Sequence, residues 1–495
     1  MSKQSTSNTA QAMWIGIGSL FSFLFAIVSS AILSRYLTKT EYGTYKQVLY
    51  VYTTLQSVFT LGLPLAYSFF LPRVSKGEGK TLTRRLEIAF LALGSVFSLV
   101  LFFGADTIAV ILKNPNLGIN IKIFSPTPVL VLPTMGLQGI LATYKKTIWN
   151  AIYIVATRIL MVIFVALPVA FYRADCQTAV LGFVIASFIS LIVAMWVKNI
   201  PYKGVKKEPC SIRYKEIFRY STPLMIAGLY GIGAKAADQF FISRYYGQEV
   251  FADFANGSLE LPFVSMVLSA GATVLLPVFS EMVSNKEASN KIVELWTRTS
   301  VKSALILYPL IVFFWFFASD TLTFLYGDKF LASAIYFRIM LVVNFFTVVP
   351  FYPIMLALDK TKEYARIHMV IFIAVWLLEY WSVKTINSPY AITAISVLCN
   401  LAKLLLMFNV VRKTLEQPMT SMLPIGKLMK IFVSCISMGF VSWYAIGLSP
   451  FAHIKILSIG VGFLLFIGLT LLISKPLKLD YFDVVRPVLS KYIKI

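Results

Sequence analysis

Long apolar runs of membrane-spanning length dominate the pattern of this chain. Fourteen of them follow one another through 495 residues, and the polar stretches between them are too short to fold as domains. A helix needs about 20 apolar residues to cross the hydrocarbon core of a bilayer, and these runs lack the alternation of an outer-membrane β-barrel. The predicted spans are 12–33, 47–71, 86–104, 121–142, 149–171, 178–197, 217–242, 254–279, 300–319, 332–357, 365–384, 389–410, 429–448 and 453–474. The sequence therefore predicts an all-α integral membrane protein with about 14 transmembrane helices.

The basic charge of the chain is distributed unequally between alternate loops. The formal net charge is +23, which in a soluble protein would favour a nucleic-acid partner. If the N-terminus is cytoplasmic, 31 of the 45 Lys and Arg residues lie on that side, 11 lie on the other side and three lie within spans. Cytoplasmic loops of membrane proteins carry such an excess. We therefore expect both termini to be cytoplasmic, basic loops in contact with anionic membrane lipids, and no nucleic-acid partner.

An internal repeat predicts how the helices are organised. Shifting the chain by 209 residues places Ser34-Arg35-Tyr36 on Ser243-Arg244-Tyr245, and nine of the 45 positions from 34 to 78 then match. A unit of six helices is even in number, so both copies insert in the same orientation, which is the parallel-repeat arrangement of some transporters. We predict two six-helix lobes, 1–200 and 201–415, followed by an additional helix pair and cytoplasmic tail, 416–495.

Two stretches of the sequence resemble a known family. Residues 33–37 followed by 41–45 (LSRYL and EYGTY) are similar to the junction between the first two spans of polysaccharide flippases, the O-antigen and capsule type of the multidrug/oligosaccharidyl-lipid/polysaccharide exporter superfamily. Residues 219–224 (RYSTPL) resemble the entry to the seventh helix of these flippases. The resemblance implies a protein of the bacterial inner membrane that moves undecaprenyl-diphosphate-linked oligosaccharide from the cytoplasmic to the outer leaflet by alternating access. It also implies contact with other membrane proteins of polysaccharide assembly.

Ionisable residues within spans are the first candidates for substrate binding, because a charge in hydrocarbon costs several kcal/mol. Lys235 and Asp238 lie on one face of the seventh predicted span, in a stripe with Gly228 and Gly231 that allows a helix or a ligand to approach. A buried salt bridge that only fixes this helix is the alternative interpretation. Asp238 is also a candidate for ion coupling.

Two more cations lie within predicted spans. Arg158 is near the middle of the fifth span, and Lys403 lies about two turns from the cytoplasmic end of the twelfth. A diphosphate carries at least two negative charges, and cations in a cavity of low dielectric constant attract it. We therefore expect Arg158, Lys235 and Lys403 to bind substrate, although Lys403 has the alternative of extending to the interface.

The repeated positions supply the remaining candidates. Arg35 and Arg244 end the first and seventh spans on the outer side, where they would serve as a gate or as an anchor at the interface. Gln47 and its repeat equivalent Asn256 belong to spans with many polar side chains, which suit a hydrated cavity. Glu260 is a candidate for proton or cation coupling.

The predicted spans also contain a glutamate and several prolines. Glu379, between Trp376 and Trp381, is interpreted as an interfacial residue without a role. Prolines such as Pro350 and Pro353 interrupt several spans and give bends and free carbonyls that moving helices can use.

The sequence has no catalytic motif. Gly79-Lys80-Thr81 is similar to the end of a phosphate-binding loop, but Val74 occupies the position of the required glycine. Only His368 and His453 are available for a zinc-hydrolase site, and the four cysteines lack metal-binding or redox spacing. We therefore expect no enzymatic activity, no cofactor and no metal site.

Two alternatives to the flippase remain open. An ion-coupled multidrug exporter of the same superfamily typically has twelve helices, so the additional helix pair argues against it. A membrane-bound polysaccharide polymerase or ligase would require a large outer loop with catalytic carboxylates or arginines, and the sequence has no loop of that length.

Overall fold

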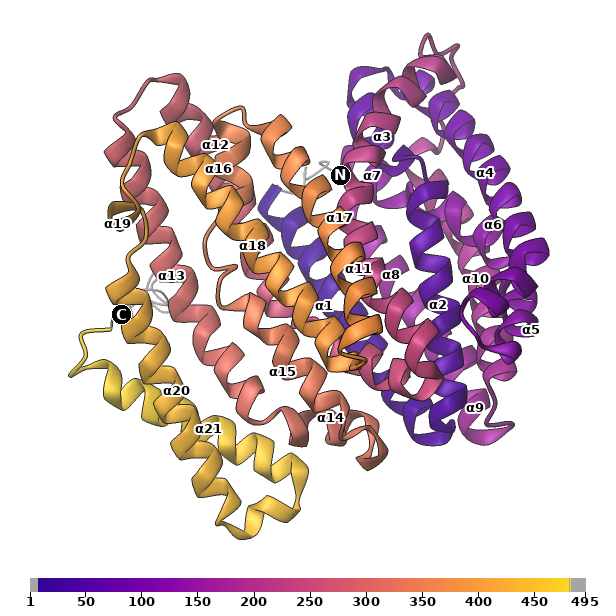
Figure 1. Cartoon of the computed structure of the whole chain (residues 1–495). Coiled ribbons are helices and arrows are strands. Elements are labelled where there is room, and N and C mark those ends of the chain that lie inside the picture. Colours follow the sequence, from indigo (N-terminus) through magenta and orange to yellow (C-terminus); the bar gives the residue numbers. More distant parts are fainter. Residues whose placement is uncertain (1–7, 480, 482–495) are drawn as a thin grey trace, which may run out of the picture. The chain divides into compact units, whose positions relative to one another are not determined.

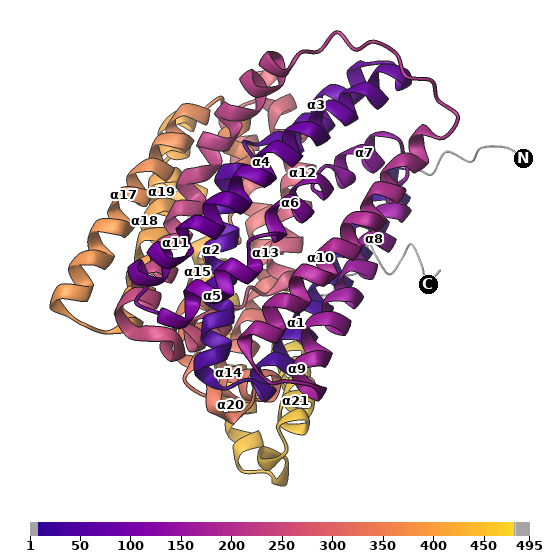
Figure 2. The same cartoon turned by 90° about the vertical axis from the view of Figure 1, so that its right-hand side faces the viewer.

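The computed structural model describes residues 8–479 and residue 481, and this part of the chain is helical without any strand (Figures 1 and 2). Contacts divide the chain into two compact units, Met1–Ala252 and Asp253–Ile495. Helices that begin in the first unit are α1 (Asn8–Tyr36), α2 (Lys39–Phe59), α3 (Leu63–Phe70), η1 (Leu71–Arg73), α4 (Lys76–Ile111), α5 (Pro115–Phe124), α6 (Thr127–Val131), η2 (Leu132–Thr134), α7 (Leu137–Thr143), α8 (Thr147–Met161), η3 (Val162–Ala166), α9 (Leu167–Phe171), α10 (Cys176–Asn199), η4 (Ile200–Tyr202) and α11 (Tyr214–Gly257).

The second unit continues from the last turns of α11. Its helices are α12 (Pro262–Ser284), α13 (Ser289–Phe316), α14 (Ala318–Tyr326), η5 (Asp328–Phe330), α15 (Ser333–Asn344), α16 (Phe351–Ala357), α17 (Thr361–Thr385), α18 (Pro389–Leu415), α19 (Met419–Met422), α20 (Ile425–Gly447), η6 (Pro450–His453) and α21 (Lys455–Ser474). The division into two six-helix lobes remains a prediction. The end of the predicted cytoplasmic tail, 482–495, lies outside the described residues.

Among the described residues, eleven helices are long and apolar enough to cross a membrane. The count is twelve if α2 and the segment Leu63–Arg73, bent by 46° relative to each other, form one span. Two predicted spans do not meet these criteria, because 217–242 falls within the charged helix α11 and 332–357 is divided between the short helices α15 and α16. The predicted all-α membrane fold is confirmed, while the predicted number of about 14 spans is not reached by these criteria.

The bend between α2 and α3 has a local cause. Leu61 and Gly62 adopt positive φ angles of 47° and 68°, which end the helix. Gly62 also lies so close to α11 that a Cβ atom built on it would be 2.6 Å from the carbonyl oxygen of Ser221. Glycine is therefore favoured at position 62, because it tolerates both the positive φ angle and the close approach of α11.

The repeat is visible in the positions where the helices break. Thr38, extended at φ −63° and ψ 159°, separates α1 from α2, and Gly247, at φ 83° and ψ 179°, interrupts α11 at the equivalent position 209 residues later. The next break differs, because α2 continues to Phe59 whereas α11 ends at Gly257 and the chain is non-helical until Pro262. The predicted eighth span, 254–279, was therefore wrong at its start.

The connection between α10 and α11 is held along the first turns of α4. Lys80 Nζ donates to the carbonyl of Val205 at 2.8 Å, Thr81 Oγ1 donates to the carbonyl of Glu208 at 2.7 Å, and Arg85 Nη1 donates to the carbonyl of Cys210 at 3.0 Å. These bonds satisfy carbonyl groups that an extended segment would otherwise expose. The most basic connection of the chain is thus a fixed strap within the first unit.

The additional helix pair packs on α13 in the second unit. Helix α20 lies against α13 and α21, as Figure 1 shows at the C-terminal end of the chain. Glycines make the approach close, since a Cβ atom on Gly439 would be 2.7 Å from the Phe316 ring and one on Gly462 would be 2.6 Å from the Phe317 ring. Small residues provide the packing that drives helix association in lipid.

We predict that Gly182 is essential for packing of the first unit. Pro168 lacks the N–H group that would bond to the carbonyl of Phe164 four residues earlier, so this carbonyl projects from the π-helical turn η3 toward α10. A Cβ atom on Gly182 would overlap that carbonyl oxygen. Gly182→Ala should lower the stability by about 1–3 kcal/mol or abolish monodisperse expression, measured by thermal unfolding in detergent.

The matched control is Gly468→Ala in α21, where a Cβ atom would meet nothing within 4 Å. This variant should unfold at the same temperature as the parent protein or slightly above it. Equal stability of both variants would contradict the proposed packing role of Gly182.

Candidate functional site

Four buried polar side chains form a hydrogen-bonded group at one end of the first unit, which we call the polar cluster: Thr44, Gln47, Asn114 and Ser243. Gln47 Nε2 donates to Ser243 Oγ at 2.7 Å, and Gln47 Oε1 accepts from Asn114 Nδ2 at 2.6 Å. Asn114 Nδ2 also approaches Thr44 Oγ1 at 3.0 Å. The polar cluster therefore joins α2, the turn after α4, and α11.

Local structure fixes the orientation of Asn114. It is the N-cap of α5, and its Oδ1 accepts from the N–H of Asn116 at 3.1 Å, with Pro115 at the first helical position. Since the oxygen is occupied by the cap, the amide nitrogen is directed toward α2. The N-cap residue of α5 thus donates the hydrogen bonds that link α5 to α2.

The two repeated arginines have different surroundings. Arg244 Nη1 donates to the carbonyl of Ile111, one of the last carbonyls of α4, and so links α11 to α4 next to the polar cluster. The guanidinium also lies 5.7 Å from the Tyr245 ring, which Lys113 approaches at 5.5 Å. Arg35 lies in the last turn of α1 and is exposed. Of the two predicted gate residues, the structure connects Arg244 to the polar cluster region.

A hydrogen bond between equivalent positions marks a local twofold axis. Thr40 Oγ1 donates to Glu249 Oε1 at 2.7 Å, and these residues are 209 positions apart, which equals the offset of the repeat. Under twofold symmetry, a residue contacts its own equivalent only near the axis. Beside this bond, Gly43 lies so close to Gln248 that a Cβ atom would overlap its carbonyl. The two copies of the repeated segment therefore meet at this end of the first unit, without space between them.

The charged candidates of the first unit lie on its surface or just beneath it. Arg158 on α8 is exposed, and its Nε donates to Ser22 Oγ on α1 at 2.8 Å. Lys235 is exposed on α11, whereas Asp238, one turn further, is buried. Gly228 on the same helix faces open space, since a Cβ atom there would meet nothing within 4 Å. Within the part of the chain that the structure describes, the position of Gly228 therefore has space for a side chain.

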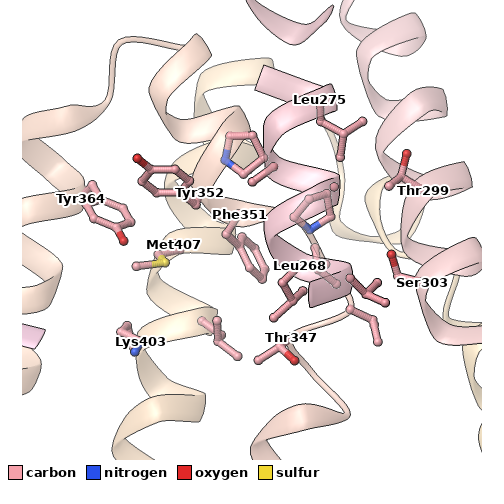
Figure 3. A pocket seen from close by; sticks show the side chains of 18 of the residues that line it. Leu268, Leu275, Thr299, Ser303, Thr347, Phe351, Tyr352, Tyr364, Lys403 and Met407 are labelled. Carbon is pink, nitrogen blue, oxygen red and sulfur yellow. The ribbon is translucent and has the colours of Figure 1, made fainter. Parts of the chain in front are cut away.

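Lys403 lines a pocket in the second unit, between α12, α13, α17, α18 and the break between α15 and α16 (Figure 3). The pocket has a volume of about 220 Å³. Lys403 Nζ donates to Asn400 Oδ1, one turn earlier on α18, at 2.7 Å. The lysine is half-buried beside the pocket, which differs from the alternative in which it extends to the interface.

A family model identifies the family of this chain. Residues 9–283, more than half of the chain, match the family model described as "Polysaccharide biosynthesis protein". The chain belongs to this family. A search of curated protein sequences finds no match.

Solved structures show the same fold. A structure described as the lipid II flippase MurJ in an inward closed conformation has a TM-score of 0.70 at 15% identity, covering 93% of this chain and 99% of that one. An inward-facing MATE family multidrug transporter of the MOP superfamily has a TM-score of 0.62 at 12% identity, covering 82% and 98%. A MOP superfamily transporter from Pyrococcus furiosus reaches 0.57 at 13% identity, covering 82% and 94%. This chain therefore has the fold of these flippase and transporter structures, and its family agrees with the resemblance seen in the sequence.

The other predicted residues lie in the second unit. Asn256 is buried near the end of α11, where the adjacent Gly257 packs against the backbone of Ser333. Glu260 is exposed in the non-helical stretch before α12. Glu379 is fully buried in α17. Its predicted depth at the membrane interface stays a prediction, since burial between helices can occur at any depth.

Three residues of these sites were missed in the sequence. Asn114 carries a local signal, because Asn before Pro is a frequent helix start. Ser243 is the repeat equivalent of Ser34, and both are fully buried. His368 contributes to the pocket at Lys403, and its only sequence signal is the rarity of histidine in this chain. No group of three or more potential metal ligands occurs among the described residues.

We predict that Gln47→Leu weakens the contact between α2 and α11. The substitution leaves the buried amide of Asn114 and hydroxyl of Ser243 without their partner, at a cost of about 1–3 kcal/mol per group. In a Thr40→Cys, Glu249→Cys background, oxidative cross-linking should be slowed several-fold by Gln47→Leu, as measured on gels of purified protein.

Gln56→Leu on the same helix is the matched control. Gln56 Nε2 donates to Tyr52 Oη one turn earlier and to Met135 Sδ, so neither of these bonds involves α11. This variant should cross-link at the parent rate. An equal loss of cross-linking in both variants would mean that any change in α2 disturbs this end of the unit.

Proposed function

We propose that the protein translocates undecaprenyl-diphosphate-linked oligosaccharide from the cytoplasmic to the outer leaflet by alternating access. Its family is that of polysaccharide biosynthesis proteins. The lipid II flippase structure covers 93% of the chain, whereas the MATE transporter covers 82%, so the flippase also accounts for more of the chain. This coverage favours a flippase over an ion-coupled multidrug exporter of the same superfamily. A polysaccharide polymerase or ligase has no support in the sequence.

The main structural support for this mechanism is the polar cluster. It connects the two copies of the repeat through bonds that require Gln47, Asn114 and Ser243 together, and Gly43 packs against the carbonyl of Gln248 nearby. Such a buried network has two clear states, formed and broken, because a half-satisfied network is costly. We assign it as the outer gate in its closed state. Arg244 strengthens this gate through the carbonyl of Ile111.

The orientation follows from the charge distribution. The excess of Lys and Arg on alternate loops supports cytoplasmic termini in a bacterium. In this proposed orientation the polar cluster lies at the outer surface of the inner membrane. The strap along α4 then lies on the cytoplasmic side, where its lysines contact anionic lipids. The first and last residues of the chain, 1–7 and 482–495, lie outside the described part.

The exposed cations Arg158 and Lys235 bind the diphosphate in this mechanism. An arginine fork binds phosphate oxygens in pairs, and a lysine adds a point charge. Arg35 at the end of α1 attracts the same diphosphate. Asn256, buried near the end of α11, is a further candidate for contact with the glycan once the helices move. Asp238 and Glu260 are the candidates for coupling to a proton or cation gradient. Transport requires no enzymatic step or cofactor, and other membrane proteins of polysaccharide assembly would deliver or receive the substrate.

The orientation predicts a pattern of cysteine labelling in intact cells. Lys113 and Lys384 are exposed and are assigned to the outer side, whereas Lys206 is exposed on the strap. With a membrane-impermeant maleimide, Lys113→Cys and Lys384→Cys should react and Lys206→Cys should react only after the cells are opened. The reverse pattern would overturn the proposed direction of transport.

The role of Arg158 can be separated from its structural bond. If the guanidinium attracts diphosphate, Arg158→Gln should reduce translocation of a lipid-linked oligosaccharide in proteoliposomes by at least about tenfold, because a charge-assisted bond is lost. Protein abundance should remain normal, since Arg158 is exposed. Arg158→Lys should retain part of the activity.

Ser22→Ala provides the control, because it removes the partner of Arg158 and keeps the charge. This variant should translocate substrate at nearly the parent rate. A loss in Ser22→Ala as large as that in Arg158→Gln would assign Arg158 to the packing of α1 on α8.

A further inference from the structure

The pocket at Lys403 has the dimensions of a single small molecule. Its volume of about 220 Å³ corresponds to roughly seven water molecules at liquid density. That space accommodates one sugar ring and is too small for an oligosaccharide. Figure 3 shows Lys403, Tyr364 and Thr347 around one side of this space and Thr299 and Ser303 on the other. All lining residues belong to the second unit, so the pocket is separate from the polar cluster.

Irregular backbone forms part of the wall. Helix α15 ends at Asn344, α16 begins at Phe351, and residues 347–350 between them line the pocket. Non-helical backbone at membrane depth is tolerated where it is buried in protein or faces a hydrated cavity, because lipid cannot satisfy its polar groups. Broken helices of this kind form substrate sites in transporters. The prolines at 350 and 353 were predicted to interrupt this span, and the structure places the interruption at the pocket.

The polar groups around the pocket are of several kinds. Three aliphatic hydroxyl groups, from Thr299, Ser303 and Thr347, line it together with the ammonium group of Lys403. The Nε2 atom of His368 is buried and has no hydrogen-bond partner among the residues that the structure describes. A buried nitrogen without a partner is costly, and a ligand hydroxyl group would satisfy it.

Aromatic rings provide an apolar surface next to these groups. The Tyr364 ring lies 4.5 Å from the His368 ring and 5.8 Å from the Tyr352 ring, measured between centroids. Phe351 and Met407 complete this part of the wall. A sugar ring has one apolar C–H face and a rim of hydroxyl groups, which match an aromatic surface beside hydroxyl and imidazole groups.

The positive charge of Lys403 favours some sugars over others as ligands of the pocket. Lys403 is the one cation in the described lining, and this lining contains no carboxylate. A single ammonium group balances a single negative charge, whereas a diphosphate is better matched by several cations or an arginine fork. The lining therefore fits a carboxylated sugar better than it fits the diphosphate to which we first assigned Lys403.

We propose that the pocket binds one acidic sugar, a hexuronate or a similar carboxylated hexose, of the lipid-linked glycan. Lys403 pairs with the carboxylate, His368 and the three hydroxyl groups bind the ring hydroxyls, and Tyr364 and Tyr352 cover the apolar face. This assignment rests on the proposed flippase function, and it adds a site in the second unit that distinguishes acidic from neutral glycans.

Binding of free sugars to the purified full chain in lipid nanodiscs tests this site. Saturation-transfer NMR and calorimetry would compare D-glucuronate, D-glucose and inorganic phosphate at constant ionic strength. We expect glucuronate to bind at least about tenfold more tightly than glucose. Lys403→Gln should remove this preference, and Lys403→Arg should keep it. Lys413→Gln, an exposed lysine later on α18, is the matched control and should bind like the parent.

The other possible results of these measurements also support or overturn the proposed sugar site. His368→Ala should weaken both sugars, and the parallel variant Ser303→Ala tests the opposite wall if the first fails to fold. Equal binding of glucose and glucuronate would overturn the acidic selectivity, and phosphate binding as tight as glucuronate would make the pocket a general anion site. If glucuronate binds but no lipid-linked glycan is translocated, the flippase proposal fails. Translocation without glucuronate binding would overturn only the pocket.

Discussion

The requirement that every backbone polar group be satisfied away from water governs this protein. In hydrocarbon an unpaired N–H or carbonyl group costs several kcal/mol, so the chain is helical wherever it faces lipid. Three departures from helical bonding among the described residues are matched by a partner or a close neighbour. The bend at Gly62 packs on the Ser221 carbonyl, and the freed carbonyl of Phe164 meets Gly182. Arg244 donates to a terminal carbonyl of α4. The functional candidates lie close to such departures.

The two copies of the repeat share their first break and differ at the next one. Both interrupt the chain at the same position, Thr38 in one copy and Gly247 in the other, so the hairpin at the end of the first helix is common to both. After this point the copies differ, because the second helix of the second copy breaks about ten residues earlier. Gln47 and Asn256 are both buried, and the longer side chain of Gln47 reaches Ser243 and Asn114 at once.

A lipid-linked acidic glycan would present two kinds of negative charge. The diphosphate is compact and multiply charged, and exposed cations on helix faces are suited to it because several of them can reach its phosphate oxygens. A sugar carboxylate is singly charged and attached to a ring, which requires a shaped pocket with hydroxyl and imidazole groups. Arg158 and Lys235 have the first kind of surroundings, and Lys403 has the second. Charge alone in the sequence does not distinguish these cases, since the difference lies in what surrounds each cation.

Hydropathy in the sequence determined the all-α membrane fold, because it is a sum over local residues, and the short motifs at 33–45 and 219–224 indicated the family. The repeat also fixed which segments are equivalent. Tertiary structure decided the rest. The bond between Gln47 and Ser243 joins residues 196 positions apart and depends on the rotation of α2 and α11 about their axes, which hydropathy does not encode. The burial of Glu379, the early break before Pro262 and the position of His368 in a pocket depend likewise on which helix faces meet. In a membrane protein the lipid-facing and protein-facing sides are equally apolar, so packing between helices leaves little periodic signal in the sequence.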